Sequence, residues 1–353
     1  MIAAGGTAGH VVPALAFADA LRARGAEVEF IGGERAEAEL VPAAGYPFHR
    51  VRVRGLDRRR PVRAALALLL ATGATLRAIR LLGRLRADAV LGGGGYVAGP
   101  VGVAATLLRR PLVLTEADSH LGVTNRLLAP FAKRVFLAFP LGGRRRKRKW
   151  IVSGRPVPAA TGRVDRAAAR ARFGIGPDEL CVLVFGGSLG ARRLNEAALA
   201  AFGAAAPCAV LHASGQRDHE DLRRQLDELG SPPHYHLYPY IEPFADALAA
   251  ADLVVARAGG SVMEVAAAGL PAVLVPYPHA TADHQTANAR FVEAAGAAVV
   301  VPDAELDGPR LAREVGALLA APQRLATMAN AAQAVARPDA AEAVADALIA
   351  LAR

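Results

Sequence analysis

Residues 5–10 have the sequence Gly-Gly-Thr-Ala-Gly-His, and residues 186–191 have the sequence Gly-Gly-Ser-Leu-Gly-Ala. Each stretch follows a short apolar run and precedes a segment of helical composition. Glycine lets the backbone of such a strand-to-helix turn approach a ligand, and the unpaired N–H groups of the following helix favour an anion. Two turns of this design, one in each half of the chain, predict two similar domains that face each other across a cleft.

Short β-branched runs alternate with longer alanine- and leucine-rich segments along the chain. This pattern is typical of parallel sheets covered by helices on both faces. The predicted fold class is α/β, with two Rossmann-like, doubly wound domains whose ligands bind at the carboxyl ends of the strands. We expect strands at residues 1–4, 27–31, 88–92, 111–115, 134–138, 150–152, 180–185, 208–212, 235–238, 252–256, 272–275 and 298–301.

A segment rich in turn-forming residues, Ser-Gly-Arg-Pro-Val-Pro at residues 153–158, marks the expected domain boundary. We expect an N-terminal domain over residues 1–157 and a C-terminal domain over residues 158–337. A last helix over residues 338–353 carries aliphatic residues at helical spacing, and we expect it to pack back toward the N-terminal domain.

The composition is that of a globular protein. The chain has 353 residues, of which 53% are hydrophobic and 21% charged, enough for two domains with cores. The uncharged apolar run at residues 64–76 is shorter than the ~20 residues of a spanning helix, and residues 1–5 lack the basic region of a signal peptide. We therefore expect a cytoplasmic location. Cys181 and Cys208 lie in apolar runs without metal-ligand spacing, and we assign them neither a disulfide nor zinc.

The formal net charge of +10 favours an anionic partner. A phosphorylated substrate, an anionic membrane face and a nucleic acid all satisfy this condition. Proteins that bind nucleic acids interleave basic with aromatic residues, whereas aromatic residues are 5% of this chain and its basic runs stand beside leucines. We expect no nucleic-acid partner, and a basic nucleic-acid-binding protein is the remote alternative.

Both glycine turns contain a candidate functional side chain. His10 stands where a helix begins, and a histidine at the mouth of a cleft acts as a general base near neutral pH. The alternative is a histidine that only hydrogen-bonds its loop. The hydroxyl of Ser188 is placed to hold a phosphate oxygen, and a helix N-cap is the alternative. Neither turn fits the glycine patterns of dinucleotide folds or P-loop ATPases.

Two further segments follow predicted strands. Residues 253–264 form a strand, a turn of small residues and a helix start, and Glu264 is placed to accept hydrogen bonds from two vicinal hydroxyls, as in a ribose. Stabilisation of the helix dipole is the alternative role. Residues 283–288, Asp-His-Gln-Thr-Ala-Asn, carry amide and imidazole groups that suit the hydroxyls of a sugar. An ordinary solvated loop is the alternative there.

Together these motifs resemble the MurG family, glycosyltransferases of the GT-B fold that act in peptidoglycan synthesis. The resemblance spans nearly the whole chain. It rests on six motifs in order: the first glycine turn, GGGGYVAGP at residues 92–100, LGVTN at residues 121–125, the second glycine turn, Arg257-x-Gly…Glu264, and His284-Gln-x-x-Asn-Ala.

The resemblance implies a reaction. An inverting enzyme of this family moves N-acetylglucosamine from UDP-N-acetylglucosamine to the C4 hydroxyl of the muramyl sugar in undecaprenyl-diphosphate-muramyl-pentapeptide. It implies no metal ion and no other cofactor. A GT-B transferase or epimerase for another nucleotide sugar is the alternative, because the nucleotide-binding loops discriminate less than the order of all six motifs.

The resemblance also implies roles for individual residues. His10, or less favourably Asp118, would be the catalytic group that removes the proton of the acceptor hydroxyl. Gly94 and Tyr96 would lie on the acceptor side. The residues implied in donor binding are Thr7, Ala8, Gly9, Asp118, Arg155, Ser188, Ile241 through its backbone, Gly260, Ser261, Glu264, His284 and Gln285.

The chain departs from the family pattern at four places. Asp118 stands where an asparagine is common, and His284 replaces the first residue of a Gln-Gln pair. Pro158 stands where the family has a nucleotide-contacting arginine, a role that Arg155 would take over. The loop from Arg257 to Glu264 is one residue shorter than usual, so its contacts can slide by one position.

A basic and leucine-rich segment fits the lipid-linked acceptor. Arginines precede and follow an expected helix that carries Leu66, Leu69 and Ile79. Such a helix can lie on an anionic membrane and receive the polyprenyl-diphosphate acceptor, and packing of the same residues in the core is the alternative. We therefore expect a peripheral protein on the cytoplasmic face of the cell membrane. The basic run at residues 144–149 is expected to be a solvated loop.

Overall fold

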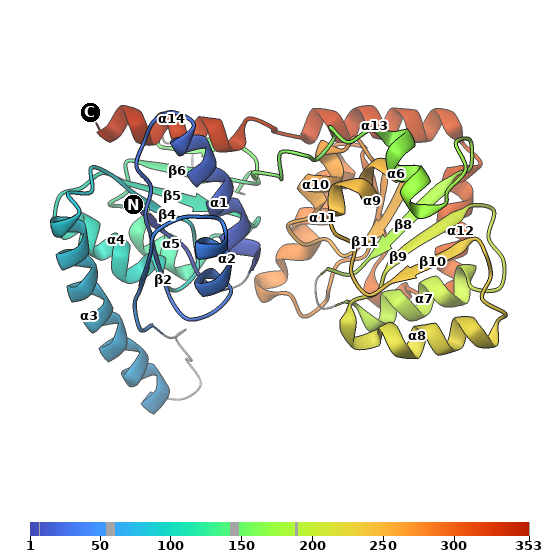
Figure 1. Cartoon of the computed structure of the whole chain (residues 1–353), viewed down its shortest axis with the longest axis horizontal. Helices are drawn as coiled ribbons and strands as arrows, with labels where there is room; N and C mark the ends of the chain where they lie inside the picture. The colour runs from blue at the N-terminus through green and yellow to red at the C-terminus, as the bar shows by residue number, and fades with distance from the viewer. Residues whose placement is uncertain (7, 54–60, 142–147, 188–189, 353) are drawn as a thin grey trace. The chain divides into compact units, whose positions relative to one another are not determined.

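The computed structural model describes residues 1–6, 8–53, 61–141, 148–187 and 190–352. The chain forms two compact units (Figure 1). Unit 1 contains Met1–Pro156 together with Arg337–Arg353, and unit 2 contains Val157–Ala336. Each unit has its own parallel sheet and its own hydrophobic core.

Unit 1 contains a seven-stranded parallel sheet with the order β3-β2-β1-β4-β5-β6-β7. Six of the strands coincide with the predicted runs. Strand β3 was not predicted, because its three residues, Phe-His-Arg, include two polar side chains and form no apolar run, whereas β7, the other edge strand, reads Trp-Ile-Val. The strands are β1 (Ile2–Ala3), β2 (Phe30–Gly32), β3 (Phe48–Arg50), β4 (Val90–Gly92), β5 (Leu112–Glu116), β6 (Arg134–Leu137) and β7 (Trp150–Val152).

Helices cover both faces of this sheet. One core lies under α3, α4 and α5, and a second core includes residues of α1 and α14. Helix α14 packs against α1, so the C-terminal segment belongs to unit 1 although all of unit 2 precedes it in the sequence (Figure 1). The helices are α1 (Ala8–Arg22), α2 (Glu37–Ala43), α3 (Pro61–Arg84), α4 (Ala98–Leu107), α5 (Val123–Leu128) and α14 (Ala340–Ala352).

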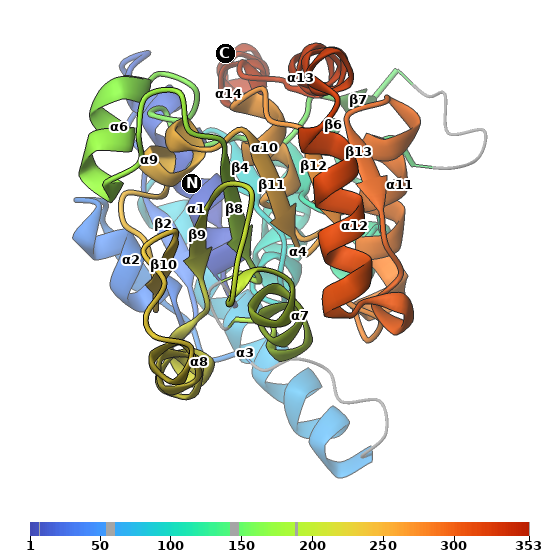
Figure 2. The ribbon, with the colours of Figure 1, turned by 90° about the vertical axis from the view of Figure 1, so that its right-hand side faces the viewer.

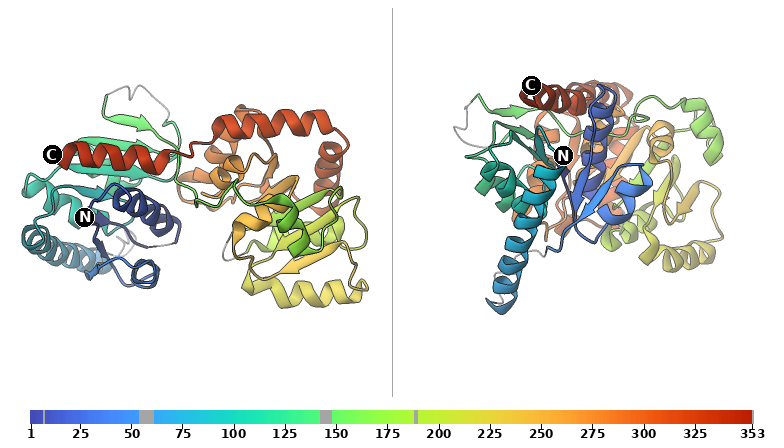
Figure 3. Two further views of the ribbon diagram at one scale, coloured as in Figure 1. Left: turned by 45° about the horizontal axis from the view of Figure 1, so that its top comes forward. Right: turned by 60° about the vertical axis from the view of Figure 1, so that its left-hand side comes forward.

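Helix α3 is longer than the uncharged run in the sequence indicates. Within the described residues, Leu66–Arg84 is long and apolar enough to cross a membrane by length and composition, with a mean hydropathy of 1.5. The uncharged run at residues 64–76 is part of this longer helix, which continues past Arg77 to Arg84; length and composition alone do not show a membrane span, since core helices pass the same test. Ala74, Ala78 and Leu82 pack in the core of unit 1, while the first turns of α3 extend past the rest of the unit (Figure 3).

Unit 2 contains a six-stranded parallel sheet with the order β10-β9-β8-β11-β12-β13. All six strands coincide with predicted runs, since strands buried on both faces are continuous apolar segments. They are β8 (Cys181–Phe185), β9 (Ala209–Ala213), β10 (Tyr235–Tyr238), β11 (Leu253–Ala256), β12 (Ala272–Leu274) and β13 (Ala298–Val300). The thiols of Cys181 and Cys208 are buried, which raises the pKa of Cys181 to about 12 and that of Cys208 to about 11.

The helices of unit 2 also lie on both faces of its sheet (Figure 2). Helices α7 and α12 pack against each other, and their apolar residues join the core with β8 and β11. The helices are α6 (Arg166–Phe173), α7 (Arg192–Phe202), α8 (Gln216–Glu228), α9 (Phe244–Ala250), α10 (Val262–Ala267), α11 (His284–Ala294), α12 (Gly308–Leu319) and α13 (Pro322–Val335), with short 3-10 helices at Thr281–Asp283 and Asp303–Glu305.

The strand order reverses beside the first strand of each sheet. Strand β1 lies between β2 and β4, and β8 lies between β9 and β11. Doubly wound sheets bind ligands at the carboxyl ends of the strands at such a reversal. The two glycine turns follow β1 and β8, and the loops at residues 93–97 and 257–261 follow β4 and β11. The topology therefore places one candidate site in each unit.

Candidate functional site

In unit 1, the first glycine turn and the loop after β4 touch each other. Gly94 and Gly95 have positive φ angles of 87° and 74°, a region that favours glycine. A Cβ atom on Gly95 would overlap the carbonyl oxygen of Gly5, and one on Gly94 would lie 2.8 Å from Cδ2 of His10. Gly94 therefore supports the imidazole of His10, and both glycines are required by this close approach.

His10 lies in the first turn of α1 and lines a small pocket with Glu116, Ala117 and Arg155. Burial is the largest effect on His10, and it lowers the pKa of the imidazole. The negative charges of Asp118 and Glu37 raise this pKa, and the positive charge of Arg155 lowers it, so that the net change is downward. The imidazole is therefore neutral at pH 7 and can accept a proton. The charges of Asp118 and Glu37 favour the protonated form of the ring, and the charge of Arg155 disfavours it.

Arg155 connects two loops of this site. Its Nη2 donates to the carbonyl oxygen of Gly9 at 2.8 Å, and its Nη1 lies 3.4 Å from the carbonyl oxygen of Ala117. The guanidinium group therefore ties the first glycine turn to the loop after β5. Arg155 therefore lines the same pocket as His10. Asp118 directly follows Ala117, whose carbonyl oxygen Arg155 contacts.

Glu116 is a buried carboxylate at the end of β5. Its Oε2 accepts from the backbone N–H of Gly122 at 2.8 Å and from Nδ2 of Asn125 at 3.0 Å, and Asn125 also donates to the carbonyl oxygen of Thr115 at 2.9 Å. Burial raises the pKa of Glu116, and these donors partly offset the rise. Glu116 was not predicted as a site residue, although it stands two positions before Asp118.

Tyr96 lies beside the first glycine turn. A Cβ atom on Gly6 would lie 3.5 Å from Cε1 of Tyr96, and the guanidinium of Arg35 lies 5.6 Å from the centre of the ring. Burial raises the pKa of Tyr96, so the phenol is neutral. Ala8 begins α1, while Thr7 and Ser188 lie outside the described residues.

In unit 2, Arg257 ties together the loops that follow three strands. It donates to the carbonyl oxygens of Val275 at 3.2 Å and Pro276 at 3.3 Å, and it forms an ion pair of 2.5 Å with Asp303. Only 8% of Arg257 is exposed. A buried charge persists when it is paired and hydrogen-bonded, so this residue fixes the end of β11 relative to its neighbours.

The start of α11 lies against the loop after β11. Oε1 of Gln285 accepts from the backbone N–H of Tyr277 at 2.9 Å, and Nδ2 of the buried Asn288 donates to the carbonyl oxygen of Ala258 at 3.1 Å. A Cβ atom on Gly259 would lie 3.9 Å from Nε2 of Gln285. The structure therefore brings Gln285 to the loop that carries Gly260 and Ser261.

The remaining predicted donor residues lie at the same edge of the sheet. Ser261 directly precedes α10, and Glu264 is half-buried in that helix. The imidazole Nδ1 of His284 lies 2.9 Å from the carbonyl oxygen of Thr281. The side chain of Ile241 is buried in the loop after β10.

A buried hydrogen-bond chain supports the second glycine turn. The hydroxyl of Tyr235 lies 2.8 Å from Nδ1 of His212, and Nε2 of His212 lies 3.1 Å from Oδ1 of Asn195. Nδ2 of Asn195 then donates to the carbonyl oxygen of Ser214 at 2.9 Å. A Cβ atom on Gly190 would overlap that same oxygen. Burial lowers the pKa of His212 to about 3, so this histidine stays neutral.

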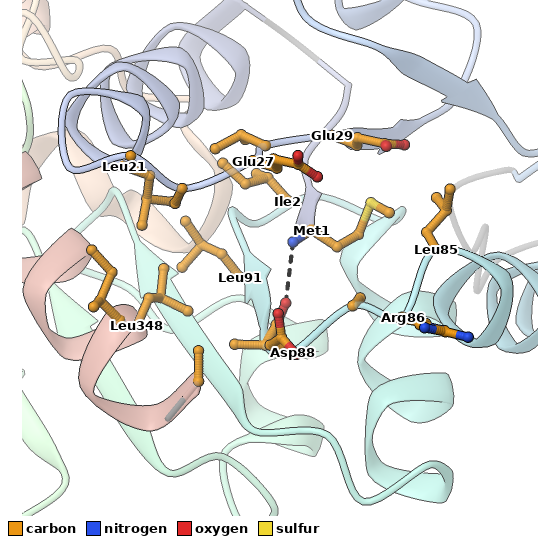
Figure 4. Close-up of a pocket in the computed structure, with 17 residues that line it drawn as sticks. Met1, Ile2, Leu21, Glu27, Glu29, Leu85, Arg86, Asp88, Leu91 and Leu348 are labelled. Atoms are coloured by element: carbon orange, nitrogen blue, oxygen red, sulfur yellow. Dashed lines mark hydrogen bonds between the residues drawn. The ribbon is translucent and has the colours of Figure 1, made fainter.

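A cavity of about 380 Å³ lies at the amino ends of the unit 1 strands, at the opposite end of the strands from the first glycine turn (Figure 4). The ammonium group of Met1 lies in it and donates to the carbonyl oxygen of Ala89 at 3.1 Å, among Glu27, Glu29 and Asp88. The amino ends of parallel strands face the negative ends of the covering helices. This cavity is therefore unsuited to a nucleotide diphosphate.

Comparisons with known proteins agree with this architecture. Residues 1–137 match the glycosyltransferase family 28 N-terminal domain, and residues 181–344 match the glycosyltransferase family 28 C-terminal domain. The chain is therefore a two-domain glycosyltransferase of family 28. This confirms the predicted GT-B class of two doubly wound domains.

Individual relatives specify the family further. A UDP-N-acetylglucosamine–N-acetylmuramyl-(pentapeptide) pyrophosphoryl-undecaprenol N-acetylglucosamine transferase of Moorella thermoacetica is 45% identical, over 98% of this chain and 96% of the relative. The crystal structure of MurG from Acinetobacter baumannii is similar with a TM-score of 0.80 and 34% identity, over 99% of this chain and 98% of that one. The chain belongs to the MurG family.

A more distant similarity bears on the alternative function. The UDP-GlcNAc 2-epimerase of Neisseria meningitidis has a TM-score of 0.70 but only 13% identity, over 99% of both chains. This similarity shows the fold alone.

Proposed function

We propose that this enzyme transfers N-acetylglucosamine from UDP-N-acetylglucosamine to the C4 hydroxyl of the muramyl sugar in undecaprenyl-diphosphate-muramyl-pentapeptide. The observation that carries the proposal is the placement of all six motifs at the carboxyl ends of the two sheets, within a chain of this family. Relatives that bear the name of this transferase are 36–47% identical over nearly the full chain.

Unit 2 holds the donor in this proposal. Glu264 accepts hydrogen bonds from the ribose hydroxyls, Gln285 from the hydroxyls of the sugar, and the backbone of Ile241 contacts the uracil. Support comes from the contacts among the loops after β11 and β12, which hold Gln285 beside Gly259 and anchor Arg257. Backbone N–H groups of the second glycine turn and the N-terminus of α7 take the diphosphate.

His10 is the proposed general base. As the acceptor oxygen bonds to C1 of N-acetylglucosamine, the bond from C1 to the UDP oxygen breaks and the hydroxyl proton passes to the imidazole. The single displacement inverts the configuration at C1. The neutral state of His10 and the nearby carboxylates support this role. The turn N–H groups and the helix N-terminus stabilise the leaving UDP.

Independence from metal ions is part of the proposal. The N-terminus of α7 and the backbone N–H groups supply the positive field that the leaving diphosphate needs. Transfer should therefore continue in excess EDTA.

We also propose that unit 1 rests on the cytoplasmic face of the membrane, where the lipid-linked acceptor lies. Leu66 and Leu69 on α3 are exposed, and Leu107, Leu127 and Phe131 on or after α4 and α5 are more than 60% exposed. These three helices pack in sequence beside one another. Ile79, in contrast, is half-buried against the core, so it contributes little to this surface.

Basic side chains accompany these apolar ones. Exposed arginine and lysine residues stand at the end of α3, after α4, and within and after α5. Anionic lipid headgroups attract such residues by about 1 kcal/mol each. The residues are Arg77, Arg80, Arg84, Arg109, Arg126, Lys133 and Arg134.

A transfer assay tests the proposed reaction. The enzyme is given the lipid-linked muramyl-peptide with UDP-N-acetylglucosamine, UDP-glucose or UDP-N-acetylgalactosamine, and product is separated by chromatography. We expect N-acetylglucosamine transfer only. Equal use of another donor, or release of an epimerised donor without transfer, would overturn the proposal.

A further inference from the structure

The first glycine turn already contains a bound carboxylate. Oε2 of Glu37 accepts from the backbone N–H of Gly6 at 2.9 Å, and Oε1 accepts from the backbone N–H of Gly33 at 2.9 Å. Glu37 begins α2, and none of its surface is exposed. Its carboxylate therefore joins the turn after β1 to the loop after β2.

The surrounding glycines provide the space for this carboxylate. A Cβ atom on Gly5 would lie 2.6 Å from Oε1 of Glu37, and one on Gly33 would lie 2.9 Å from the same oxygen. A Cβ atom on Gly32 would lie 2.8 Å from Cγ of Glu37. No side chain fits at these three positions while Glu37 stays in place.

A phosphate at such a turn would use the same contacts. Glycine turns that precede a helix hold phosphate oxygens through backbone N–H groups near the positive end of the helix. In unit 1 the Glu37 carboxylate takes the N–H of Gly6, two residues before α1 begins. An external phosphate would have to displace Glu37 and would then stand next to a second negative charge.

Unit 2 has a carboxylate in the corresponding helix but a different arrangement. Asp218 lies in the first turn of α8, which follows β9 as α2 follows β2. Its oxygens accept from Asn195 at 3.1 Å, from Arg217 at 2.9 Å and from Arg192 at 3.3 Å. Two arginines thus offset its charge, and Asn195 stands between it and Ser214 beside the turn.

We propose that Glu37 is a positioning residue that occupies the backbone N–H of Gly6 in the first glycine turn, so that this N–H holds the turn around His10 and does not bind a phosphate. Recognition of the diphosphate is left to the second turn. The catalytic consequence rests on the proposed function, whereas the exclusion of phosphate from Gly6 does not depend on it.

The wild-type enzyme tests the exclusion without any substitution. Inorganic pyrophosphate, and in a second sample UDP, is titrated into ¹⁵N-labelled enzyme while the amide resonances of Gly6, Gly33 and Gly187 are followed. We expect Gly187 to shift and Gly6 and Gly33 to stay. A shift of Gly6 at the concentration that moves Gly187 would overturn the proposal. Failure of the donor assignment appears separately, as a Gly187 resonance that does not respond to UDP.

The substitution Glu37→Gln tests the effect on His10. Glutamine keeps the shape and one acceptor, but its amide N–H₂ group faces one of the two backbone donors and the charge is lost. We expect kcat to fall at least tenfold, while KM for UDP-N-acetylglucosamine stays within twofold. Glu39→Gln, at an exposed glutamate of the same helix, is the matched control and should behave as wild type.

The pH profile separates positioning of His10 from a purely structural role. The charged groups acting on His10 are Asp118, Arg155 and Glu37, and the Glu37 charge raises the His10 pKa. Loss of that charge should move the acidic limb of kcat/KM to lower pH. A purely structural defect would lower the active fraction without moving the limb. A Glu37→Gln enzyme with the wild-type kcat and the wild-type limb would overturn the positioning role.

Discussion

Replacement of the two most exposed leucines of α3 should release the enzyme from membranes. Leu69 is 70% exposed and Leu68 is 62% exposed. Leu69 and Leu76 are seven residues apart and share one side of the helix, opposite the buried Ala74. Leu68→Gln and Leu69→Gln keep a residue of similar helix propensity at each position, so the helix itself should persist.

The exposed fractions set the size of the effect. Full burial of a leucine side chain is worth about 1.5–3 kcal/mol, so insertion of each of these partly exposed leucines into lipid stabilises the bound state by about 1–2 kcal/mol. A free energy of 1.4 kcal/mol is a tenfold change in an equilibrium constant. Each substitution should therefore lower the partition coefficient roughly 5- to 30-fold, and both together roughly 30- to 700-fold.

Co-sedimentation with vesicles measures this coefficient. Vesicles of phosphatidylglycerol and phosphatidylcholine are titrated at low and high salt with the wild type, the double variant and Leu229→Gln. Leu229, which is 48% exposed in unit 2, is the matched control and should bind as wild type. Unchanged binding of the double variant, or an equal loss in the control, would refute the membrane role of α3.

Three further predictions concern unit 1 and unit 2 separately. His10→Ala should reduce kcat/KM for a soluble acceptor roughly 10²- to 10⁴-fold with little change in thermal stability, because it removes the proposed base; near-normal turnover would remove His10 from the mechanism. Glu264→Gln should raise KM for UDP-N-acetylglucosamine roughly 10- to 100-fold, since hydrogen bonds to a charged group are worth about 1.5–3 kcal/mol, and an unchanged KM in initial-rate kinetics would contradict the ribose contact. His212 has a pKa of about 3 in the folded chain, below its unfolded value. As the pH falls, its imidazole therefore binds a proton in the unfolded chain before it does so in the folded chain. Its contribution to stability is complete above the unfolded pKa near 6.5 and is lost as pH falls toward 3, by up to about 1.4 kcal/mol per pH unit. Urea unfolding between pH 7.5 and 4.5 should show this slope in the wild type and a shallower one in His212→Gln; equal slopes would contradict it.

The sequence predicted most of the fold because parallel strands and glycine turns have strong local signals. Strands buried on both faces are continuous apolar runs, and all twelve expected runs coincide with strands of the structure. Strand β3 lacks that signal, because its residues Phe-His-Arg do not form an apolar run. Helix α3 was predicted on both sides of Arg77, because Leu66, Leu69 and Ile79 recur at helical spacing.

The candidate site was predicted unevenly for a related reason. His10, Gln285 and Glu264 stand directly in loops or first helical turns after strands, where sequence position alone indicates a ligand-binding edge. Glu37 and Asn195 lie in helices and look like ordinary polar residues of a solvated face. Both are in fact completely buried.

The sequence by itself determined that this chain has two doubly wound domains, each with a glycine turn at the carboxyl end of its first strand. It distinguished the two turns by their side chains, His10 in the first and Ser188 in the second, but not by the charged groups that surround each turn. The tertiary structure decided the difference by bringing Glu37 onto the N–H of Gly6, while Asp218 is drawn to Asn195 and two arginines. The packing of α2 and of α8, which lie more than 20 residues after their turns, brings the carboxylates of Glu37 and Asp218 to these positions.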